Sequence, residues 1–149
     1  FAGRGTAIFS ATALGRRVFG IEISPVGWIY ARTKLSPAPL DEVEVRLMQV
    51  VEKSADYYAQ AKSLPKFFKK CFSPSTRRFL LAARHNLDWR RSTCDRTLMA
   101  ILLVYLHGKE RQALSNQMRQ TKAMSPRYAI KWWDENGTKP PNYDAMEFL

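Results

Sequence analysis

Cysteine and long apolar runs are both scarce in this chain. Only two of its 149 residues are cysteines, Cys71 and Cys94, and their spacing matches neither a zinc site nor a disulfide framework. The longest apolar run, Leu98 to Leu106, is far shorter than the ~20 residues that a membrane-spanning helix needs. No basic region precedes an apolar one, so no secretory signal is expected. These absences predict a cytoplasmic protein with free, buried thiols, no metal and no membrane partner.

The sequence also lacks the histidine arrangements of catalytic or metal sites and the glycine patterns of common phosphate-binding motifs. The two histidines, His85 and His107, have no partner in the sequence for acid–base or metal chemistry, and we expect both to be structural. A phosphate-binding P-loop needs lysine after its last glycine, and none follows Gly5. A dinucleotide fingerprint needs a third glycine where this chain has Ile8, which argues against a pyrophosphate ligand.

Positive charge is abundant and unevenly distributed. The net charge is +11, and residues 63–131 alone hold fifteen basic and three acidic residues, an excess of +12. Such a concentration favours a polyanionic partner, nucleic acid before membrane. The alternative is a solvated basic face without a partner.

Local signals predict several helices and one strand. The pair Ser-Pro occurs three times at an expected helix start, at Ser24, Ser73 and Ser125. Arg17 to Ile23, rich in β-branched and aromatic residues, is predicted to be a strand. A lone strand leaves its edges unpaired, so residues 18–23 are expected to pair with sheet outside this sequence or with a second copy of the chain.

The first residues form the most informative pattern. Gly3-Arg4-Gly5 is typical of the turn between a strand and a helix, and Glu22 ends the following apolar run. Glycines let a backbone approach a ligand closely, and such an acid accepts hydrogen bonds from ribose hydroxyls. The pattern therefore predicts a nucleoside-like ligand, and also a domain whose first strand precedes Phe1.

This pattern resembles a known family. Phe1-Ala2-Gly3-Arg4-Gly5-Thr6 is similar to the first motif, Asp-Pro-Phe-x-Gly-x-Gly-Thr, of DNA amino-methyltransferases that use S-adenosylmethionine. Gly20-Ile21-Glu22-Ile23-Ser24-Pro25 resembles their second motif. Three later stretches resemble the helical target-recognition insertion of one subgroup: Leu106-His107-Gly108-Lys109, Leu114-Ser115-Asn116-Gln117-Met118 and Met124-Ser125-Pro126-Arg127-Tyr128.

The resemblance implies a fold, a cofactor and site residues. The implied fold is an α/β fragment, mostly helical: part of a Rossmann-like methyltransferase sheet in residues 1–36, and a basic α-helical insertion for DNA recognition in residues 37–149. S-adenosylmethionine would be the cofactor, with Glu22 on its ribose and Ile23 on its adenine. The residues implied to bind it are Phe1, Ala2, Gly3, Gly5, Thr6, Glu22 and Ile23.

The family's catalytic motif is not found in this sequence. That motif is Asp, Asn or Ser, then Pro-Pro, then an aromatic residue, whereas Pro140-Pro141 here lies between Lys139 and Asn142. Lysine cannot accept a hydrogen bond from the target amine, and Asn142 offers no stacking face. We therefore assign no catalytic residue and expect this chain alone not to methylate DNA.

Double-stranded DNA is the expected partner. Basic side chains would contact phosphates, while polar ones in the Ser115–Ser125 segment would reach base edges. The predicted DNA-binding residues are Lys69, Lys70, Arg77, Arg78, Arg90, Arg91, Asn116, Gln117, Arg119 and Lys122. The sequence also leaves open a helical nucleic-acid-binding module without catalytic activity and, less favoured by Ile8, a dinucleotide-dependent enzyme.

Overall fold

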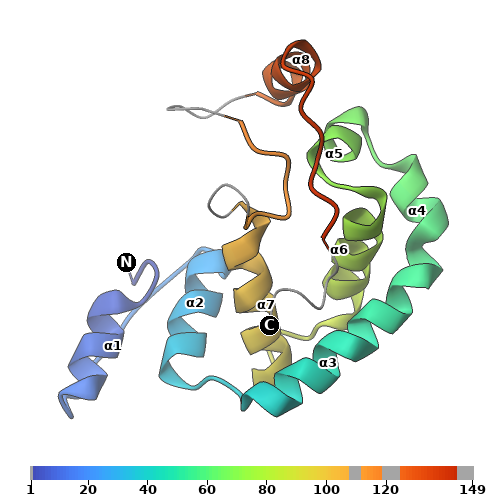
Figure 1. Cartoon of the computed structure of the whole chain (residues 1–149). Helices are drawn as coiled ribbons and strands as arrows, with labels where there is room; N and C mark the ends of the chain where they lie inside the picture. Colours follow the sequence, from blue (N-terminus) through green and yellow to red (C-terminus); the bar gives the residue numbers. More distant parts are fainter. Residues whose placement is uncertain (1, 108–111, 119–124, 144–149) are drawn as a thin grey trace. The chain divides into compact units, whose positions relative to one another are not determined.

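The computed structural model describes residues 2–107, 112–118 and 125–143 (Figure 1). Every regular element in these ranges is a helix. In chain order they are α1 (Thr6–Ala13), α2 (Pro25–Leu35), α3 (Leu40–Lys53), the 3-10 helix η1 (Ser54–Tyr57), α4 (Tyr58–Ser63), α5 (Lys66–Cys71), α6 (Pro74–Asn86), α7 (Thr93–Leu106) and α8 (Pro126–Glu135).

The predicted α/β fold class is wrong for the described residues, which form an all-α structure. Residues 16–23 form no regular element, so the expected strand at Arg17–Ile23 is not formed. A strand requires repeated backbone pairing with a neighbour. Here a single backbone–backbone bond reaches residues 17–23, from the N–H of Ala2 to the carbonyl of Ile21 at 2.8 Å. The described part of the chain therefore contains no sheet, Rossmann-like or otherwise.

The predicted helix starts are confirmed because their signals are local. α2, α6 and α8 each begin at the proline of a Ser-Pro pair. Ser73 Oγ accepts the N–H of Thr76 at 3.2 Å, and Ser125 Oγ accepts that of Tyr128 at 3.2 Å. Each serine thereby satisfies an N–H of the first helical turn.

The chain divides into two compact units. Unit 1 comprises residues 1–47 and 87–103, and unit 2 comprises residues 48–86 and 104–149. In unit 1, the Thr33 hydroxyl donates to the carbonyl of Arg96 at 3.4 Å, and the N–H of Ala38 donates to Thr97 Oγ1 at 2.9 Å. These bonds join α2 and the segment after it to α7. The largest side chains buried in this unit include Val43, Leu47 and Leu98.

Unit 2 has its own core. Helix α5, which the sequence did not predict, packs against α8, and the ring of Phe67 lies 5.7 Å from that of Trp133. The buried members of this cluster are Cys71, Phe72, Leu114, Ala129 and Trp133. A helix of only six residues is marginal by itself, so tertiary packing stabilises α5.

Candidate cofactor site

The glycine turn opens α1 in a conformation that side chains disfavour. Gly3 and Gly5 both have positive φ, 54° and 72°. A Cβ at Gly5 would lie 2.6 Å from Cα of Ala31 in α2, so only glycine permits this approach. A Cβ at Gly3, in contrast, would meet nothing within 4 Å. Space is therefore open beside Gly3 and closed beside Gly5.

Glu22 is bound to this turn through its carboxylate. Its Oε2 accepts the N–H of Gly3 at 2.6 Å, and its Oε1 accepts the N–H of Ser24 at 2.9 Å. The hydrogen bonds from Ser24 and then Gly3 hold the pKa of Glu22 below its ordinary value. The carboxylate is thus ionised and oriented at neutral pH, and each of its oxygens retains a second lone-pair position for another donor.

Gly27 makes this arrangement possible, although it was not among the residues predicted from the sequence. It lies in α2 and is buried. A Cβ there would lie 2.9 Å from both the Glu22 Cγ and the Gly3 carbonyl oxygen. A glycine near the start of a helix, where it weakens the helix, was the signal available in the sequence.

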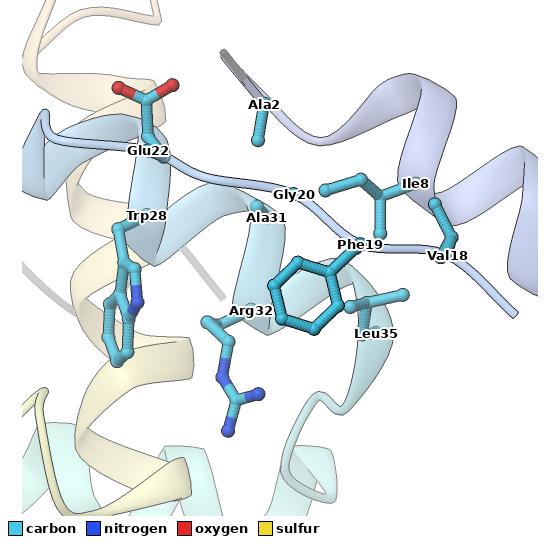
Figure 2. A pocket seen from close by; sticks show the side chains of 10 residues that line it. All are labelled: Ala2, Ile8, Val18, Phe19, Gly20, Glu22, Trp28, Ala31, Arg32 and Leu35. Atoms are coloured by element: carbon cyan, nitrogen blue, oxygen red, sulfur yellow. The ribbon is translucent and has the colours of Figure 1, made fainter.

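A cavity of about 310 Å³ adjoins Glu22 (Figure 2). This volume lies near the lower end of the ~300–1,000 Å³ usual for small-molecule sites. Most of its wall is apolar, while Glu22 and Arg32 supply opposite charges and Trp28 an indole ring. Its lining comprises Ala2, Ile8, Val18, Phe19, Gly20, Glu22, Trp28, Ala31, Arg32 and Leu35.

The structure brings together some of the predicted cofactor residues and separates others. Gly3 and Glu22 are in direct contact, and Ala2 and Glu22 line the same cavity. Thr6 lies at the exposed start of α1, where its hydroxyl accepts a hydrogen bond from Lys34 Nζ at 3.3 Å. Ile23, expected to pack on adenine, is 80% exposed. Phe1 lies outside the described residues.

The predicted DNA-binding cations belong to both units. In unit 2, Lys69 is exposed, whereas the ammonium of Lys70 forms an ion pair with Asp134. Arg77 and Arg78 are half-buried, and the buried Nε of each lacks a hydrogen-bond partner. Burial also lowers the pKa of Arg77.

In unit 1, Arg90 and Arg91 are both exposed in the segment before α7. The guanidinium carbon of Arg90 lies 4.8 Å from the centroid of the Trp89 ring. The backbone N–H of Arg91 donates to the Asp88 carbonyl at 3.2 Å.

The two described residues predicted to read bases are held internally. Asn116 is buried, and its amide donates to the carbonyls of Lys70 and Thr138 at 3.2 and 3.3 Å. The amide of Gln117 donates to the carbonyl and hydroxyl of Ser115. In this arrangement both amides are engaged within the protein. Arg119 and Lys122 lie outside the described residues.

Other site types find no support in the part of the chain that the structure describes. It holds no group of three or more metal-ligating side chains, and both cysteines are free thiols. Burial raises the pKa of the Cys71 thiol to about 12, so it is not a nucleophile at neutral pH. None of the described helices has the length and apolarity needed to cross a membrane.

Comparisons with protein families, with curated proteins and with solved structures found no match to this chain.

Proposed function

We propose that this chain is the cofactor-binding and DNA-contacting part of a cytoplasmic S-adenosylmethionine-dependent DNA methyltransferase that acts on an exocyclic amino group of cytosine or adenine. The observation that carries the proposal is the 2.6 Å bond from the Gly3 N–H to the Glu22 carboxylate. These residues are 19 positions apart, and they belong to the two motifs whose resemblance implies a shared cofactor site. The proposal rests on this site and not on the fold class.

The residues present suit the adenosine end of such a cofactor. The ionised Glu22 has free lone-pair positions that could accept ribose hydroxyls, and the space beside Gly3 lets a ligand approach the backbone. The bonds to Gly3 and Ser24 fix the carboxylate before a ligand arrives, which lowers the entropy lost on binding.

The bound cofactor supplies an electrophilic methyl group, and the role of this chain is to orient it. Methyl transfer between two positioned reactants depends on alignment more than on acid–base chemistry. An enzyme of this kind acts on a base that has left the duplex stack. No residue of this chain takes the catalytic role, because Lys139-Pro140-Pro141-Asn142 lacks both the acceptor and the aromatic ring.

Titration calorimetry of the 149-residue chain with S-adenosylmethionine and with S-adenosylhomocysteine tests the proposal. The Glu22→Ala variant should lose at least about tenfold in affinity, since a ribose loses its charged acceptor. Glu44→Gln, which also removes one exposed acid from unit 1, is the matched control and should bind as the unchanged chain does. Absence of binding at ~1 mM ligand, or equal affinity in the Glu22→Ala variant, would contradict the proposal.

A second function, a helical nucleic-acid-binding module without catalysis, is favoured by the all-α structure and the net charge of +11. Salt-dependent DNA binding with no binding of either cofactor form would support this alternative instead.

A further inference from the structure

Arg96, on α7, is a buried cation without a counter-charge. The side chain is only 5% exposed. Its Nη2 donates to Thr93 Oγ1 at 3.0 Å, its Nη1 makes a long 3.5 Å contact with the Trp89 carbonyl, and its buried Nε has no partner. No carboxylate pairs with it among the residues that the structure describes. Burial of an unpaired charge is costly, so a nearby anion would be stabilising.

Arg96 and a second cation, Arg32, both lie close to the indole ring of Trp28. The guanidinium carbons of Arg96 and Arg32 lie 5.7 and 5.8 Å from the centroid of the Trp28 ring. The pKa of Arg96 is lowered first by burial and then by the positive charge of Arg32. The neighbouring acid, Asp95, is already engaged with Arg46 and with the N–H of Asp88. Two like charges therefore share one site, and Asp95, the acid next to Arg96 in the sequence, is engaged with other partners.

A second indole extends the site. The Trp89 ring packs edge-on against Trp28, with centroids 5.8 Å apart, and Arg90 lies over Trp89. Both tryptophans are half-buried, while Arg32 and Arg90 are exposed. We call these five residues the Trp28 cluster: Trp28, Arg32, Trp89, Arg90 and Arg96. All five belong to unit 1, and two of them, Trp28 and Arg32, also line the cavity beside Glu22.

The residues of the Trp28 cluster come from three segments of the chain. Trp28 and Arg32 lie one turn apart on α2, and Figure 2 shows them side by side on that helix. Trp89 and Arg90 come from the segment between α6 and α7, and Arg96 from the first turns of α7. The bond from the Thr33 hydroxyl to the Arg96 carbonyl holds α2 against α7. Helices thus position the two cations before any ligand binds.

We propose that the Trp28 cluster binds one nucleotide of a DNA strand, with Arg32 and Arg96 pairing with its phosphodiester and an indole ring stacking on its base. Guanidinium groups bind phosphate through paired hydrogen bonds, and combined arginine and aromatic surfaces are how proteins hold unpaired strands. This inference deepens the proposed function, on which the choice of DNA depends. An enzyme that modifies an extruded base must also hold the locally opened strand.

Fluorescence anisotropy with a labelled single-stranded oligodeoxynucleotide, measured over a range of salt concentrations, tests the cluster. Replacement of the exposed Arg32 by glutamine should lower the affinity and reduce the salt slope by about 0.7, as expected for loss of one phosphate contact. The matched control is Arg16→Gln, which removes one exposed positive charge elsewhere in unit 1 and should preserve the slope. An oligonucleotide with a neutral methylphosphonate backbone should bind weakly to every variant. Equal affinities and slopes for Arg32→Gln and the unchanged chain would overturn the proposal.

Thermal unfolding in the presence and absence of inorganic phosphate provides a second test. Phosphate should raise the Tm of the unchanged chain and have a much smaller effect on Arg96→Met, in which the buried cation is absent. An equal rise in both would show that Arg96 has a structural role only, and would overturn the proposal. If Arg96→Met does not fold, Arg32→Gln takes its place in the same comparison.

Binding measurements with the oligonucleotide and with S-adenosylmethionine distinguish this proposal from the proposed cofactor site. If Arg32→Gln weakens S-adenosylmethionine binding and leaves oligonucleotide binding unchanged, the cluster serves the cofactor and the inference fails while the proposed function stands. If Glu22→Ala leaves cofactor affinity unchanged while Arg32→Gln weakens DNA binding, the proposed function fails and the nucleic-acid site stands.

Discussion

Arg46 on α3 donates from its Nε to the Asp95 carboxylate on α7 at 2.6 Å, in a pair that is largely withdrawn from water. The exposed fractions of the two side chains are 26% and 9%. The other oxygen of Asp95 accepts the N–H of Asp88 at 2.7 Å. One carboxylate therefore joins α3 to the start of α7 within unit 1, and Asp95 immediately precedes Arg96 of the Trp28 cluster in the sequence.

Replacement of Asp95 by alanine should lower the free energy of unfolding by about 3 kcal/mol, because it removes the carboxylate that accepts from the Arg46 guanidinium and from the backbone N–H of Asp88. Urea unfolding followed by circular dichroism measures this change. The exposed pair of Lys131 and Glu135 provides the control, and Glu135→Gln should cost less than about 1 kcal/mol. Equal effects of the two substitutions would contradict this account of Asp95.

The stability of unit 2 should fall at mildly acidic pH because of His107. Its Nδ1 lies 2.9 Å from the hydroxyl of Ser115, and burial lowers its pKa from the ordinary 6.5. Below pH 6.5 the unfolded chain takes up a proton more readily than the folded chain, so stability decreases as the pH falls towards the lower folded pKa. The free energy of unfolding, measured over this pH range, should depend less on pH in His107→Gln than in the unchanged chain. The control variant, His85→Gln, should keep the pH dependence that His107 contributes. A His107→Gln profile identical to that of the unchanged chain would rule this out.

The two glycines of the opening turn should differ in their tolerance of a side chain. Gly3→Ala should cost about 1 kcal/mol of stability, because its positive φ disfavours a Cβ while the space around it is open. Gly5→Ala should cost at least about 1 kcal/mol more, since its Cβ would also collide with Ala31. Thermal unfolding ranks the two variants, and the reverse order would contradict the observed turn.

Asn116 should contribute to stability and not to base recognition. Asn116→Ala removes donors from two carbonyls, those of Lys70 and Thr138, and should destabilise the chain by about 2 kcal/mol. Folded Asn116→Ala should keep its preference among DNA sequences in competition binding. Loss of that preference without loss of stability would return Asn116 to the role of reading bases.

Some of these features could be predicted from the sequence because their causes are local. A serine followed by proline favours a helix start through its hydroxyl and the fixed φ angle of the proline, and Ser73 and Ser125 form these caps as expected. α2 also begins at Pro25, but the hydroxyl of Ser24 makes no capping bond. The bond between Gly3 and Glu22 was not predicted, although the sequence assigned both residues to one ligand site. It depends on the path of the irregular segment between α1 and α2, which no local signal specifies. The strand at Arg17–Ile23 was not determined locally, because β structure needs a paired neighbour and the described residues supply only the bond from Ala2.

Burial and neighbours across the chain were decided only by the tertiary structure. Asn116 was predicted from the sequence to contact DNA, yet packing buries it and its amide donates to backbone carbonyls. Arg96 is also buried, and its guanidinium donates to the hydroxyl of Thr93. Trp28 and Arg96 are far apart along the chain and meet because α2 packs on α7. The sequence alone therefore determined the local starts of helices, while the nucleoside and polyanion ligands that it suggests remain predictions. The tertiary structure determined which charged groups are buried away from water, because desolvation depends on every segment that packs around a side chain.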